Sequence, residues 1–113
     1  MKLFQGESVS MVLTSKEANV NFDDYIIDAA LISEISIDCK IKSSGNLRPN
    51  AALYWENIPI EDNIAEFGIT SEQSKNLHPG RYFVEVALYT KINNNAAKTQ
   101  TLNIIEILPT YTR

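Results

Sequence analysis

The chain has 113 residues, of which 44% are hydrophobic and 21% charged, a composition that predicts one globular domain over residues 1–113 and excludes a disordered chain. Its net charge is −4 and its basic residues are scattered, so we expect no nucleic acid partner, because an anionic surface repels phosphate backbones. One cysteine excludes an internal disulfide, and neither a secretory signal nor a membrane span is visible, so we expect a protein that is cytoplasmic when made.

The first half of the chain carries two clear strand patterns. In ESVSMVLT, Val9, Met11 and Leu13 share one face of a period-two alternation. In EISIDCKIK, Cys39 shares a face with three isoleucines, which favours a core side chain over a reactive thiol. The segment 25–33 between them fits either a strand or a helix. Its β-branched residues and its lack of a polar stripe favour the strand.

Shorter signals follow in the middle of the chain. Strands are predicted around Leu53–Trp55 and Ile64–Phe67. The segment TSEQSKNL is the one predicted helical turn, with Thr70 or Ser71 as its N-cap.

The only histidine, His78, stands before a proline and a glycine. Pro79 suits the second position of a type II turn and Gly80 the third, where φ is positive. A catalytic histidine needs a nucleophile to activate or a carboxylate to orient it, and no motif in the chain supplies either. We therefore expect His78 to be a turn residue, and we expect no catalytic residue and no enzyme.

Two long strands end the chain. In RYFVEVALYTKI, Tyr82 and Val84 begin one apolar face, and TQTLNIIEIL is predicted to pair with this strand through a hairpin at Asn93–Asn95. Seven or eight short strands with one helical turn predict an all-β fold, namely an antiparallel, immunoglobulin-like β-sandwich.

The second face of these late strands is apolar as well. It is predicted to expose Phe83, Ala87 and Tyr89, joined by Ile105 and Ile107 of the last strand. An apolar patch of this kind is typical of an interaction surface. We interpret Phe83, Tyr89, Ile105 and Ile107 as a surface for protein partners, a second copy among them. Covering by residues 25–32 or by the helical turn is the open alternative.

The adjacent aromatics Tyr54 and Trp55 are an alternative ligand site. On a strand one of them points outwards, where it can stack on a sugar ring, although a core role for Trp55 with Tyr54 at the surface is favoured. The acidic pairs Asp23–Asp24 and Glu61–Asp62 lack the spacing and the glycine of a calcium loop. One cysteine and one histidine cannot make a zinc site, so we expect neither metal nor cofactor.

Three segments together carry a family resemblance, namely FQGESVSMVL, LHPGRYFVEVAL and TLNIIEILPTYTR. The chain resembles small immunoglobulin-like β-sandwich proteins of phage and prophage tail modules, such as the N-terminal domain of the phage baseplate upper protein. The matching positions are Gly6, Glu7, Leu77, Pro79, Gly80, Tyr82, Thr112 and Arg113. The resemblance implies a structural part of a tail or baseplate, and hence a virion-associated protein, and it implies no catalytic residue.

Overall fold

The protein folds into two β-sheets that face each other across one main core. The computed structural model describes residues 1–18, 20–34, 51–92 and 96–110. The strands in these residues are β1 (Lys2–Phe4), β2 (Val9–Thr14), β3 (Tyr25–Ser33), β4 (Ala51–Trp55), β5 (Ile60–Glu61), β6 (Ile64–Ile69), β7 (Gly80–Thr90) and β8 (Ala96–Leu108). The helices are α1 (Ser15–Ala18), the 3-10 turn η1 (Phe22–Asp24) and α3 (Ser71–Lys75).

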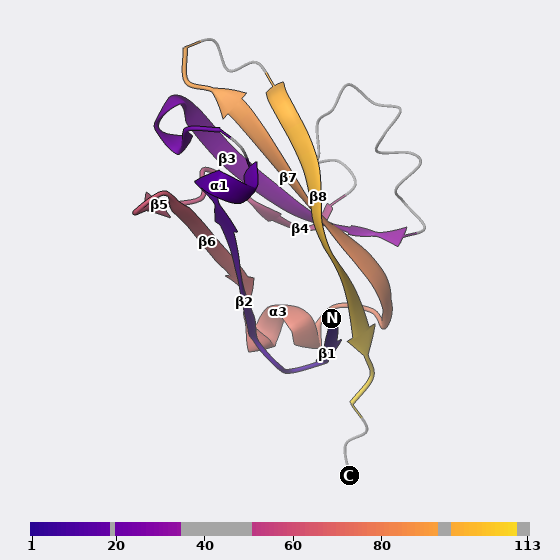
Figure 1. The fold of residues 1–113 in the computed structure, drawn as a ribbon. Coiled ribbons are helices and arrows are strands. Elements are labelled where there is room, and N and C mark those ends of the chain that lie inside the picture. The colour runs from indigo at the N-terminus through magenta and orange to yellow at the C-terminus, as the bar shows by residue number, and fades with distance from the viewer. Residues whose placement is uncertain (19, 35–50, 93–95, 111–113) are drawn as a thin grey trace.

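One sheet has the order β1-β8-β7-β3-β4 and the other the order β2-β6-β5 (Figure 1). The predicted all-β class is therefore confirmed, and so is the strand state of residues 25–33. The prediction of a purely antiparallel arrangement is wrong at one edge, because β1 pairs with β8 in parallel. The predicted strand around Cys39 and the hairpin tip at Asn93–Asn95 lie outside the described residues.

Alternation along each strand decides which side chains enter the core. In β2, Met11 and Leu13 are buried while Val12 is exposed, as the sequence pattern predicts. In β3, Ile27, Ala29 and Leu31 join the main core from one face of the strand. We call the opposite face of the five-stranded sheet, which is turned away from the main core, the outer face.

The helix α3 begins as the sequence predicts. The Thr70 hydroxyl accepts the Gln73 N–H at 3.1 Å, and the Gln73 side chain accepts the Thr70 N–H at 2.9 Å, which completes a capping box. Ser74 is fully buried and accepts the Gly6 N–H at 3.0 Å, so α3 holds the connection between β1 and β2 at one end of the molecule (Figure 1).

The corner after α3 differs from the predicted type II turn. Gly80 has the predicted positive φ, but at 149° it lies far from the value of that turn, and it already belongs to β7. The Tyr82 hydroxyl donates to the His78 carbonyl at 2.7 Å. The Tyr82 side chain thus holds the backbone just before Pro79.

We predict that the protein loses stability at alkaline pH in part through ionisation of Tyr82. Burial raises the pKa of the Tyr82 hydroxyl above its ordinary value of 10.0. The unfolded chain then loses this proton first, so the free energy of unfolding falls as the pH rises from about 10 towards the folded-state pKa. Tyr82→Phe should lower the free energy of unfolding by about 1 kcal/mol at neutral pH, because a hydrogen bond is lost. Between about pH 8 and about pH 11, the free energy of unfolding should fall less in this variant than in the wild type. Urea unfolding measures both effects. If the free energy of unfolding falls equally at alkaline pH in the wild type and in Tyr82→Phe, this role of the Tyr82 hydroxyl is contradicted.

Candidate functional site

Trp55 packs between the two sheets. Its ring lies 5.0 Å from that of Phe67 between centroids, and its indole N–H donates to the Gly68 carbonyl at 2.9 Å. The short strand β5 pairs only with Ile64 and Ala65 of β6, so it does not reach Gly68. The indole therefore bonds a carbonyl beyond the end of β5 and links β4 to the opposite sheet. This placement agrees with the core role favoured for Trp55.

Tyr54 points the other way and bonds a buried carboxylate. Its hydroxyl donates to Asp28 Oδ2 at 2.6 Å, and the Asn57 N–H donates to Asp28 Oδ1 at 2.8 Å. Asp28 is only 9% exposed, although it lies on the outer face of the sheet. Because burying a carboxylate is costly unless its oxygens accept hydrogen bonds, these two donors stabilise Asp28 at this position.

Tyr54 and Tyr89, which the sequence assigned to different sites, meet on the outer face. Both pack on a small apolar cluster made by Ala30, Ile32 and Ala87, each of them fully buried. The prediction that Ala87 is exposed is therefore wrong, because its short side chain lies within this cluster. The covering elements suggested by the sequence are wrong as well, since β3 is a neighbouring strand of the same sheet and α3 lies at its end (Figure 1).

A second buried carboxylate lies nearby on the same face. Glu85 is 5% exposed and accepts a hydrogen bond from the Thr101 hydroxyl at 2.9 Å. Glu85 pairs with Ala30, and Asp28 pairs with Ala87, so the two carboxylates occupy diagonal positions on adjacent strands. The middle of the outer face is thus part apolar and part acidic.

A hollow of about 410 Å³ opens beside these residues. Its lining consists of Ile26, Asp28, Glu56, Asn57 and Tyr89. Carboxylate and amide groups next to an aromatic ring are able to bind the hydroxyl groups and the apolar face of a sugar.

The predicted grouping of Ile105 and Ile107 with Phe83 is wrong. Both isoleucines are buried in the main core, at 0% and 1% exposure. Ile105 lies opposite Tyr82, a core residue, whereas Phe83 lies opposite Ile104, which is 42% exposed. A register shift beside Val84 and Glu85 adds a residue to β8, so the outward positions become even-numbered after it.

Partly exposed apolar residues of the outer face lie in two cross-strand pairs, and of these four residues the sequence had indicated only Phe83. Phe4 lies opposite Leu108, and Phe83 lies opposite Ile104. We call these four residues the outer strip. Phe4 is 48% exposed, and Met1, whose N-terminal amine donates to the Ile104 carbonyl at 3.2 Å, is 55% exposed. The alternation within Lys2–Phe4 is visible in the sequence, but the strand is too short to be recognised from it.

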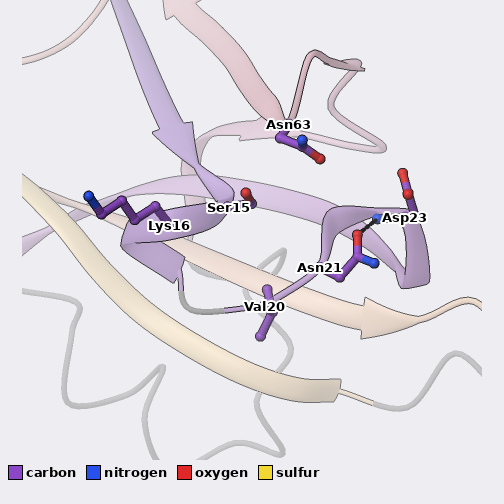
Figure 2. A pocket seen from close by; sticks show the side chains of 6 residues that line it. All are labelled: Ser15, Lys16, Val20, Asn21, Asp23 and Asn63. Atoms are coloured by element: carbon purple, nitrogen blue, oxygen red, sulfur yellow. Dashed lines mark hydrogen bonds between the residues drawn. The ribbon is translucent and has the colours of Figure 1, made fainter.

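A larger hollow of about 620 Å³ lies where β2 meets α1 (Figure 2). Its lining is mostly polar, and Asn21 there accepts the Asp23 N–H at 3.0 Å. Lys16 extends to the opposite side of Ser15 from Asp23 and Asn63 (Figure 2). The visible interactions in this hollow therefore shape a turn and bring no charged groups together.

The remaining candidates are placed as follows. The His78 side chain is exposed, and the histidine is bonded to Tyr82 through its backbone carbonyl. In the described part of the chain, no three His, Cys, Asp or Glu side chains lie close enough together to hold a metal ion. Among the same residues, no helix combines the length and the apolar character needed to cross a membrane.

No protein-family model and no curated protein matches the chain. The function is therefore inferred from the residues and their geometry.

We predict that Tyr54→Phe destabilises the protein by about 1.5–3 kcal/mol, because it removes a hydrogen bond to a buried charged group. Tyr25→Phe is the matched control. Tyr25 is half-buried and packs against the main core, and its hydroxyl has no hydrogen-bond partner in the described residues. Loss of the Tyr25 hydroxyl should lower the free energy of unfolding by less than about 0.5 kcal/mol. Urea unfolding of both variants tests this, and equal costs would contradict the role given to Asp28.

Proposed function

We propose that the protein is a non-enzymatic assembly protein that binds another protein through the outer strip. The observation that carries this proposal is the gathering of exposed apolar side chains at one edge of the five-stranded sheet. Met1, Phe4 and Ile104 are the most exposed of them there, and each is more than 40% accessible to solvent. Exposed apolar side chains that lie on one part of a protein surface favour contact with another protein.

A row of alternating charges crosses the strip. Lys2 lies opposite Glu106, and Glu106 lies opposite Arg81. Arg81 continues the row to Glu34, with 3.6 Å between the two charged groups. Exposed pairs of this kind add little to folding stability. They do favour one orientation of a partner over others, because each charge of the row is best met by an opposite charge on the partner.

The immunoglobulin-like form of the sandwich belongs to this proposal. With β2 to β8 taken as strands B, C, C′, D, E, F and G, the sheets have the orders B-E-D and G-F-C-C′ of such domains. Tyr82 near the start of strand F, bonded to the His78 carbonyl, agrees with the tyrosine corner of that fold. Val84, two residues later, stands where antibody domains have a disulfide cysteine, so here the core is purely apolar at that point.

The setting we propose is a phage or prophage tail or baseplate, and it rests on the resemblance of the sequence. A small sandwich with an apolar strip suits a structural role there. The two buried carboxylates, Asp28 and Glu85, are each bonded by neighbouring side chains, which supports a structural use of both.

Carbohydrate binding is the second candidate, and the 410 Å³ hollow is the observation that favours it. Tyr89 supplies an aromatic wall there, and Asp28, Glu56 and Asn57 supply polar groups. We leave Trp55 out of this candidate, because its ring packs against Phe67 and its N–H donates to the Gly68 carbonyl. A glycan array separates the two functions, because an assembly protein should leave the array blank.

We predict that the protein co-elutes with the product of a neighbouring gene, since tail and baseplate genes are clustered. Each neighbour is co-expressed and the mixture is separated by size-exclusion chromatography. Ile104→Asp should abolish co-elution, because it places a charge in the strip. Ile64→Asp is the control. Ile64 is 39% exposed, close to the 42% of Ile104, but lies on the other sheet. Retained co-elution of folded Ile104→Asp, or no co-elution of the wild type with any neighbour, would contradict the proposal.

A further inference from the structure

The strand β2 is an open edge of the three-stranded sheet. In the order β2-β6-β5 it pairs with β6 alone among the described strands (Figure 1). The pairing is continuous from Val9 to Thr14, so no bulge interrupts β2 as a template for another strand.

The hydrogen bond after β2 shows which backbone groups face the open edge. The Ser15 N–H donates to the Asn63 carbonyl at 3.0 Å, so these two residues form a hydrogen-bonded pair. Such pairs recur at every second residue in antiparallel strands. Leu13, Met11 and Val9 therefore direct their N–H and C=O groups to β6. Ser10 and Val12 direct theirs to the open edge.

Within β2 itself, the charge, proline or bulge that usually keeps edge strands apart is missing. The sequence VSMVLT contains no charged residue and no proline. The pairing with β6 shows no bulge, and Val12 is 47% exposed. Neutrality matters especially for pairing with an identical strand, because a charge on β2 would be repeated on the other copy and would bring two like charges onto adjacent strands.

We propose that a second copy of this chain pairs its own β2 with this edge, antiparallel and about a two-fold axis. Each Ser10 then lies opposite the other copy's Val12, and the N–H and C=O groups of both residues bond across the axis. The two Val12 side chains become diagonal neighbours on the sheet surface, and the two three-stranded sheets join into one. This contact involves no residue of the outer strip, so it leaves the strip free for the proposed protein partner.

Light scattering across a concentration series tests the pairing. We expect the molar mass to rise from the monomer value of 12.7 kDa towards twice that value as the concentration approaches about 1 mM. Val12→Lys should stay monomeric, because it places two like charges beside the axis. Ile64→Lys is the matched control. It carries the same change on the same sheet face, but on the inner strand β6, and should associate like the wild type.

Amide hydrogen exchange at low and high concentration adds a residue-specific readout. The N–H groups of Ser10 and Val12 should exchange several-fold more slowly when the protein is concentrated. A wild type that is monomeric at every concentration would overturn the inference, and so would a dimer that Val12→Lys leaves intact. Protection of Phe83 and Ile104 in place of the β2 amides would also overturn it, and would place self-association at the outer strip instead.

Discussion

The antiparallel pairing of β3 with β7 is the interaction on which the other features depend. It runs without a break along all nine residues of β3, from Tyr25 opposite Thr90 to Ser33 opposite Tyr82. Each pair puts two side chains on the same side of the sheet. This alternation sends Ile27, Leu31 and Val84 into the main core, and it sends Asp28 and Ala87 to the outer face. A slip of one residue would exchange the two sets and would leave neither face intact.

Because both strands lie in the middle of the sheet, their second faces are largely buried too. Ala30, Ile32 and Ala87 make an apolar cluster there, and Asp28 and Glu85 are buried beside it. Burial of a carboxylate is costly unless donors meet it, so the hydroxyls of Tyr54 and Thr101 are part of the fold at this point. The accessible apolar surface is consequently displaced from the centre of the sheet to its β1–β8 edge, where the outer strip lies.

The sequence predicted correctly those strands and helices that are determined by residues close together in the chain. The alternation around Met11, the capping box at Thr70 and the β-branched residues of segment 25–33 each identified the right element. Contacts between distant segments were not predictable in this way. The buried carboxylate of Asp28 was not predicted, because its partner Tyr54 lies 26 residues away. The faces of β8 were assigned wrongly because the register shift at Val84 and Glu85 reverses their parity, and a single strand carries no sign of its partner's register.

The central claim is that β8 turns Ile104 outwards and Ile105 inwards after this register shift. Thiol labelling of Ile104→Cys and Ile105→Cys, each in a Cys39→Ser background, tests it most directly. If the account is right, the thiol at position 104 reacts at nearly the rate of an unfolded chain. The thiol at position 105 should react at least about a hundredfold more slowly, because its exposure requires opening of the core. Equal rates in two folded variants, or faster labelling at position 105, would contradict the register and with it the outer strip.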